Sequence, residues 1–189
     1  MTQASASLYA ARRARLAAQL GDGGVAIIPT APEHARNRDS DFPYRHDSYF
    51  YYLTGFTEPN AWLVLDATGC STLFCQPKDL EREIWDGYRL GPDSAVAALG
   101  VSAAVSVAEL DKQLPKLLEN QHTVWYPFAT HKGLETRVDG WLNAVRARVR
   151  FGAQCPAQQR DACGPLDEMR LIKDAHEQDV MRRASTISA

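Results

Sequence analysis

Histidine and acidic residues gather in one stretch of the sequence, where their side chains suggest a metal site. His34 and His46 flank Asp39, Asp41 and Asp47 in a polar segment, and imidazole and carboxylate groups are common metal ligands. None of the five histidines, however, has the HxH, HxxxH or HExxH spacing that places two ligands side by side. We therefore favour a loop held by its own hydrogen bonds and ion pairs, and we assign no metal ligand.

The serine and cysteine residues give no recognisable nucleophile. The sequence contains neither a G-x-S-x-G motif nor a P-loop, and Cys75 has no basic residue beside it that would activate a thiol. The four cysteines form pairs five and eight positions apart, which is not the spacing of a zinc knuckle. A redox pair is the alternative, but we expect four reduced thiols and assign no catalytic residue.

The composition indicates a soluble globular protein. Of 189 residues, 45% are hydrophobic and 23% are charged, and the net charge is −2. This balance gives no reason to expect nucleic acid or an anionic membrane as a partner. No apolar run approaches the roughly 18 residues of a membrane-spanning helix, and arginines interrupt the N-terminal stretch where a signal peptide would be apolar. We therefore expect a cytoplasmic location.

The elements that would position any site alternate between helices and strands. The apolar patterns predict strands at 25–29, 61–66, 71–75, 103–107 and 123–126, and helices at 7–20, 79–86, 92–100, 108–119 and 131–149. The strands at 61–66 and 71–75 read as a hairpin. Together these patterns predict an α/β fold with a mixed β-sheet flanked by helices.

Several local expectations follow from residue types within these elements. In the first helix, we expect Arg12 and Arg15 to project into solvent, away from the apolar face. Pro115 would disrupt its helix unless it lies in the first turn. Val149 would close the apolar stripe of the last of these helices. Gly164 and the proline after it would break the chain.

The end of the sequence predicts one more helix, at 174–189. Asp174 and Glu177 resemble a capping box that opens it. Its apolar stripe would consist of Val180, Met181, Ala184 and Ile187. Because no C-cap follows, we expect a truncated chain in which this stripe has little to cover it.

Four segments, in this order, resemble the N-terminal domain of the aminopeptidase P family of Xaa-Pro aminopeptidases. They are 39–45 (DSDFPYR), 52–59 (YLTGFTEP), 83–91 (EIWDGYRLG) and 168–173 (EMRLIK). Each segment alone is weak, but the ordered set spans nearly the whole chain. The resemblance implies a creatinase-like N-terminal domain, related to ribonuclease H, over residues 1–160. Residues 161–189 would then be a linker and the first helix of the catalytic "pita-bread" domain.

The resemblance also implies an activity for the parent enzyme. In this family, the catalytic domain holds two divalent ions, usually manganese, on two Asp, one His and two Glu, and the enzyme removes an N-terminal residue that precedes proline. All five ligands would lie beyond Ala189, so the chain alone should be inactive. Its partners would be its own catalytic domain, other subunits and, in the full enzyme, proline-containing peptides.

Five residues are candidates for substrate binding or contact between subunits. In oligomeric bacterial members of the family, this domain builds subunit contacts and lends residues to a neighbouring cleft. Trp85 matches that role best, and the alternative for it is an ordinary core tryptophan. The full candidate set is Trp85, Tyr88, Arg89, Tyr44 and Arg45.

Two other functions remain open at this point. A stand-alone peptide-binding or assembly module would have the same domain without a catalytic role. A prolidase-type dipeptidase would share the two-domain layout, although these enzymes resemble the segments around Tyr44 and residues 52–56 less closely.

Overall fold

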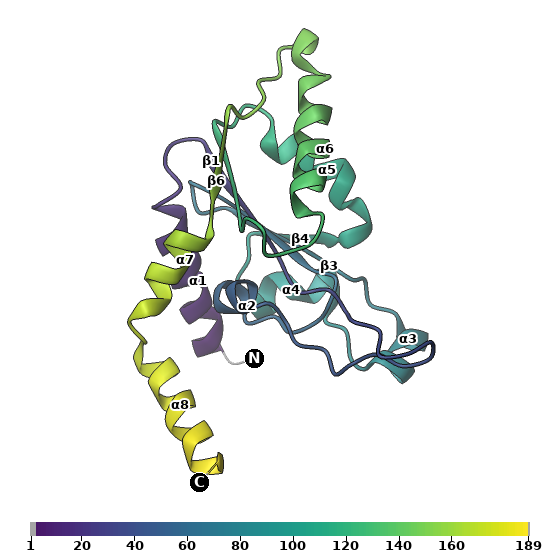
Figure 1. Cartoon of the computed structure of the whole chain (residues 1–189), viewed down its shortest axis with the longest axis vertical. Coiled ribbons are helices and arrows are strands. Elements are labelled where there is room, and N and C mark those ends of the chain that lie inside the picture. Colours follow the sequence, from purple (N-terminus) through teal and green to yellow (C-terminus); the bar gives the residue numbers. More distant parts are fainter. Residues whose placement is uncertain (1–2, 189) are drawn as a thin grey trace.

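The structure, a computed structural model, describes residues 3–188 and is built on a six-stranded mixed sheet (Figure 1). The strand order is β4-β3-β2-β1-β5-β6. Strands β1, β2 and β3 pair antiparallel, whereas β4, β5 and β6 each lie parallel to their neighbours. The strands are β1 (Gly24–Pro29), β2 (Trp62–Asp66), β3 (Ser71–Cys75), β4 (Ala103–Ser106), β5 (Thr123–Tyr126) and β6 (Gln158–Asp161). The predicted α/β fold and its hairpin are confirmed.

Helices cover both faces of the sheet (Figure 1). One face carries α1 (Gln3–Ala17), α2 (Ser48–Thr54), α4 (Gly91–Leu99) and α7 (Cys163–Leu171), and the other carries α5 (Leu110–Leu118) and α6 (Leu134–Arg146). A hydrophobic core lies on each face of the sheet: the first under α1, α2, α4 and α7, and the second under α5 and α6. Strand β1 is apolar throughout because Ala26 and Ile28 pack into the first core, whereas Val25 and Ile27 pack into the second. Two further helices, α3 (Leu80–Asp86) and α8 (Ala175–Ser188), project from this body.

The arginines of α1 correct the prediction that Arg12 would face solvent. Arg15 is exposed, but Arg12 and Arg13 are buried at 5% and 3% exposure. Arg13 donates to the carbonyls of Leu53 (3.0 Å), at the end of α2, and Leu99 (3.1 Å), at the end of α4. Terminal carbonyls of a helix lack partners within it and carry negative partial charge. A buried guanidinium therefore satisfies two helix ends at once.

Helix α5 corrects the expectation that Pro115 would disrupt it. The helix runs through Pro115, directly after a 3-10 turn at Val107–Glu109. A proline cannot donate to the carbonyl four residues earlier, which here belongs to exposed Asp111, where water can replace the lost bond. Leu110 and Leu114 lie fully buried on the same helix. Packing of this apolar face outweighs the local cost of the proline.

The C-terminal part differs from the prediction in two places. Helix α6 ends at Arg146, so Val149 lies in a separate 3-10 turn and is exposed instead of closing the stripe. Gly164 and Pro165 do not break the chain, because they lie in the first turn of α7, where a missing N–H costs nothing. Leu166 and Met169 of α7 pack into the first core.

Helix α8 begins at the predicted capping box. The backbone N–H of Asp174 donates to Glu177 Oε2 (3.0 Å), and the N–H of Glu177 donates to Asp174 Oδ1 (2.9 Å). As predicted, the apolar residues of the helix lie uncovered, and Ile187 is 87% exposed. Ala189 lies outside the described residues. None of the helices within residues 3–188 is both long and apolar enough to cross a membrane.

Candidate functional site

Several large apolar side chains are exposed together on a short projecting segment, residues 80–89, which we call the α3 arm. Its four large apolar side chains, Leu80, Ile84, Trp85 and Tyr88, are all at least 67% exposed, and Trp85 reaches 85%. Helix α3 itself contains no buried residue. Trp85 therefore lies outside the core of its own domain, so the alternative of a core tryptophan is wrong.

Polar contacts, rather than a core, hold the α3 arm in place. Asp79 caps α3 by accepting hydrogen bonds from the backbone N–H groups two and three residues on, each at 3.1 Å. Glu83 Oε1 lies 3.2 Å from Lys78 Nζ and accepts from the N–H of Arg89 (3.3 Å). Lys78 Nζ also lies 4.3 Å from the centre of the Tyr88 ring. The arm therefore returns to the body along a defined path.

A hollow of about 660 Å³ opens at the base of the arm, and we call it the α3 cleft. Three of the five predicted site residues line it: Tyr44, Tyr88 and Arg89. Trp85 and Arg45 do not. The lining contains five carboxylates and two guanidinium groups, so it is negatively charged overall. Its full set is Glu33, Asp41, Tyr44, Thr57, Glu58, Pro59, Asn60, Gln76, Asp79, Arg82, Asp86, Tyr88 and Arg89.

Tyr44 and Arg45 make local contacts within the segment that links β1 to α2. The Tyr44 hydroxyl lies 2.8 Å from Thr30 Oγ1 and 3.1 Å from the carbonyl of Ala31. Burial raises the pKa of Tyr44, so its phenol is neutral at ordinary pH. Arg45 is exposed and donates to the carbonyl of His46 (2.7 Å). Tyr44 therefore fixes this segment against β1, on the wall of the α3 cleft.

The same segment tests the metal hypothesis. Asn37 Oδ1 accepts from the N–H groups of Asp39 and Ser40, each at 2.9 Å, and the ring of His46 stacks on Tyr51 at 4.3 Å. A loop held by its own hydrogen bonds is confirmed. Within residues 3–188, no group of three His, Cys, Asp or Glu side chains is arranged to hold a metal ion. The described residues therefore do not fit the two-manganese site implied by the family resemblance.

Sequence reasoning missed Glu58, the carboxylate that anchors the far end of the α3 arm. Its Oε1 accepts from the N–H of Leu90 (2.8 Å), whereas its Oε2 is buried without a hydrogen-bond partner. Burial raises the pKa of Glu58, and the hydrogen bond from Leu90 offsets part of that shift. Its signal in the sequence was slight: a charged residue that follows a buried aromatic segment and precedes Pro59.

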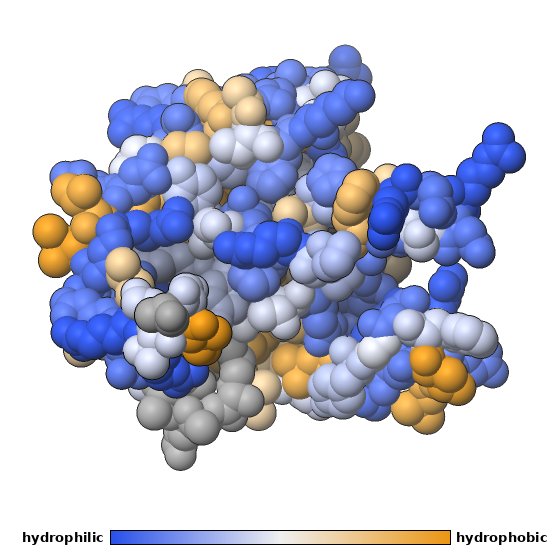
Figure 2. All heavy atoms as spheres, turned by 60° about the horizontal axis from the view of Figure 1, so that its bottom comes forward, coloured by the Kyte–Doolittle hydropathy of each residue, from blue (hydrophilic) through white to orange (hydrophobic). Residues whose placement is uncertain are grey.

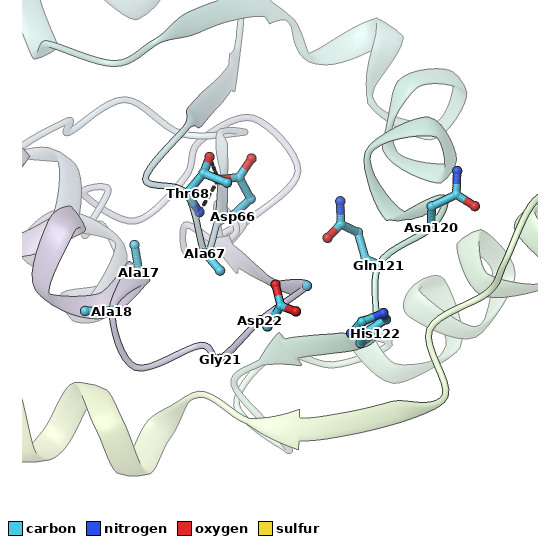
Figure 3. A pocket seen from close by; sticks show the side chains of 11 residues that line it. Ala17, Ala18, Gly21, Asp22, Asp66, Ala67, Thr68, Asn120, Gln121 and His122 are labelled. Atoms are coloured by element: carbon cyan, nitrogen blue, oxygen red, sulfur yellow. Dashed lines mark hydrogen bonds between the residues drawn. The ribbon is translucent and has the colours of Figure 1, made fainter.

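A second hollow, of about 510 Å³, lies at the opposite ends of the strands (Figure 3). Asp66 and His122 line it, but the Asp66 carboxylate already accepts from the N–H groups of Thr68 (2.9 Å) and Cys70 (3.0 Å) in the β2–β3 turn. Gly23 has φ +63°, and a side chain there would meet the His122 ring at 2.9 Å. These contacts hold the turns at this end of the sheet close together and need no ligand to account for them. The α3 arm and the α3 cleft remain the stronger candidate for a functional site.

Comparison with known proteins gives a consistent result. The family model described as "Aminopeptidase P, N-terminal domain" matches residues 9–125. The chain is 38% identical over 193 residues to the Xaa-Pro aminopeptidase of Escherichia coli, covering all of this chain and 44% of that protein. It therefore spans less than half the length of this curated relative.

Solved structures agree on the fold. Pseudomonas aeruginosa aminopeptidase PepP superposes with a TM-score of 0.93 at 40% identity, covering 97% of this chain and 42% of the other. A zinc-substituted Escherichia coli aminopeptidase P in complex with product gives a TM-score of 0.92 at 38% identity, with coverage of 97% and 42%. The sheet and helices described above are thus those of the N-terminal region of these enzymes.

Proposed function

Because the chain belongs to the aminopeptidase P N-terminal domain family, we propose that it is the non-catalytic N-terminal domain of a Xaa-Pro aminopeptidase. Such an enzyme hydrolyses the bond between an N-terminal residue and a following proline. The similarity of the whole chain to the Escherichia coli Xaa-Pro aminopeptidase supports this assignment. In the proposed arrangement, chemistry belongs to another region of the enzyme, and this domain contributes contacts.

The observation that carries the proposal is the exposure of the α3 arm. A short helix that buries none of its own residues yet presents Leu80, Ile84 and Trp85 to solvent has no role in the core of its own domain. Aromatic anchors of this kind are typical of protein–protein interfaces. On the face of the molecule seen in Figure 2, apolar side chains stand out as separate patches on a mainly hydrophilic surface. We assign the arm to contact with a second subunit.

The same arm would give this domain its part in substrate access. Trp85 stands on the exposed side of the arm, and Tyr88 and Arg89 connect it to the α3 cleft. If a neighbouring subunit packed on the arm, these side chains would contact its surface. We propose that they shape the entrance to the neighbour's peptide cleft.

We assign the metal ions of the enzyme, two manganese ions by family resemblance, to residues outside this domain. The relatives extend well beyond the matched region, which makes up 44% of the Escherichia coli protein. A metal ion would activate the water that attacks the peptide carbonyl.

All four cysteines of this chain are free thiols, which supports a cytoplasmic location for the enzyme.

Sedimentation velocity over a range of protein concentrations tests the interface. We expect the 189-residue chain to self-associate, and we expect the double variant Ile84→Asp/Trp85→Ser to remain monomeric. The matched control is Val149→Ser/Phe151→Ser, which removes two other exposed apolar side chains, 54% and 85% exposed, far from the arm. A monomeric parent chain, or equal loss of association in the control, would overturn the assignment.

A further inference from the structure

Helix α8 is attached to the rest of the chain in an unusual way. It contains no buried residue, and the three large apolar residues on it, Val180, Met181 and Ile187, are 44%, 56% and 87% exposed. Most surface helices are held by an apolar face that packs on the core. Among residues 3–188, the contacts that hold α8 are therefore polar rather than apolar.

The first turn of α8 meets a buried arginine. Arg12 Nη2 lies 2.7 Å from Asp174 Oδ2 and 3.5 Å from Glu177 Oε1, while the Arg12 side chain is only 6% exposed. These two acids are the same residues that form the capping box of α8. One guanidinium thus binds both carboxylates at the start of the helix.

Arg12 is itself held firmly by the body of the domain. Its Nη1 donates to the carbonyl of Tyr52 (3.2 Å), and its guanidinium carbon lies 4.1 Å from the centre of the Tyr52 ring. The Tyr52 hydroxyl donates to the carbonyl of Met169 (3.0 Å) in α7, the helix before α8. Arg12 therefore joins α1, α2 and the start of α8 at one point.

Because Arg12 is buried, the loss of its two carboxylate partners would be costly. A buried guanidinium cannot lose its proton, so its charge must be compensated by nearby anions or acceptors. If α8 swung away, both carboxylates would leave and the buried charge would keep only neutral partners. Such a loss is strongly unfavourable for a buried ion.

We infer that Arg12 is a positioning residue that fixes the direction of α8 relative to the sheet domain through Asp174 and Glu177. In this arrangement the charge contacts at its first turn orient the helix, and the exposed remainder extends as a rigid rod. This inference concerns only residues of this chain and does not depend on the proposed enzymatic role.

The test uses the double variant Asp174→Asn/Glu177→Gln in the 189-residue chain. Asparagine and glutamine preserve a capping box, so the helix keeps its start signal while Arg12 loses both negative charges. Arg12→Met is less informative, because it also removes the contacts with Tyr52 and can disturb the core. The matched control is Asp179→Asn/Glu168→Gln, which neutralises two exposed acids of α8 and α7.

Nuclear magnetic resonance separates orientation from folding. We expect the Cα chemical shifts of α8 to stay helical in the double variant, while its backbone order parameters fall from about 0.85 to below about 0.6. The order parameters of β1 and of the control variant should not change. Rigid α8 amides in the double variant would overturn the inference. Loss of the helical shifts would also overturn it, because the pair would then fold α8 rather than orient it.

Discussion

Arg12 Nη2 lies 2.7 Å from Asp174 Oδ2, although 162 residues separate the two in the sequence. This contact joins the first helix of the fold to the last, and it is formed by one of the two arginines that the sequence pattern assigned to solvent. The same carboxylate also caps α8, since its other oxygen accepts from the backbone N–H of Glu177.

This pair predicts a dependence of stability on pH. Partial burial alone would raise the pKa of Asp174, but hydrogen bonds from Arg12 and from the N–H of Glu177 hold it below its usual value. A lowered folded-state pKa means that the stabilisation is present above the unfolded pKa of about 3.9 and is lost as pH falls through the lower folded value. The charges of Arg12 and His176 also lower the pKa of Asp174.

Urea unfolding of the parent chain and of Asp174→Asn between pH 6 and pH 2.5 measures this effect. We expect the parent to be more stable at pH 6 by about 1 kcal/mol or less, since a third of the Asp174 side chain is exposed and water screens it. The two curves should converge toward the acid end. Because Asp161 and Glu135 also have lowered pKa values, only the difference between the curves is diagnostic. Parallel curves would contradict the prediction.

Arg13 should matter more for stability than Arg15, the exposed arginine of the same helix. Arg13→Met leaves the carbonyls that end α2 and α4 without their charged donor, and we expect a loss of about 2–4 kcal/mol. Arg15 is exposed to solvent, so Arg15→Met should change stability by less than about 0.5 kcal/mol. Thermal and urea unfolding of both variants provide the comparison. Equal effects would show that the helix ends do not need Arg13.

Glu58→Gln should stabilise the chain at alkaline pH. The raised pKa of Glu58 means that its charged form is disfavoured in the fold, so the parent loses stability as pH rises through that value. Glutamine retains an acceptor for the N–H of Leu90 without the charge. We expect a gain below about 1 kcal/mol at pH 8 that shrinks toward pH 4.5. A variant that is less stable at pH 8 would indicate that the Glu58 charge is compensated by groups of the α3 cleft.

The chain alone should not hydrolyse Xaa-Pro peptides. Enzymes of this class need a metal-activated water, and residues 3–188 offer no group of three ligands to hold the ion. The assay is cleavage of a short Xaa-Pro peptide with added manganese. Turnover that follows the purified chain and disappears with a chelator would refute the assignment as a non-catalytic domain.

Periodicity and turn residues predicted the sheet and most helices because those elements bury their apolar residues in a regular pattern. Strand β5 was predicted at its observed bounds, and both members of the α8 capping box were found. Strand β6 escaped prediction because its four residues, Gln-Gln-Arg-Asp, are polar and exposed, and it is defined only by pairing with β5. Pairing partners distant in sequence leave no local signal.

The site was predictable only in part, for a similar reason. Trp85 was singled out by the family resemblance, and the structure shows it exposed rather than in the core. The burial of Arg12 and Arg13 was not predictable, since their partners are the ends of other helices and an acid near the end of the chain. A charged residue on a helix reveals its partners only when the tertiary fold brings them together.

The accessibility of Trp85 to a quencher tests directly whether the α3 arm is a subunit contact. Trp125 and Trp141 are buried at 8% and 4% exposure, Trp62 is partly buried, and Trp85 is 85% exposed, so Trp85 dominates quenching of the fluorescence by acrylamide. We expect strong quenching at low protein concentration that weakens as the chain associates. A Trp85→Phe variant should lose most of this quenching at low concentration. Quenching of Trp85 that stays equally strong while the chain associates would contradict the account, because the arm would then lie outside the contact.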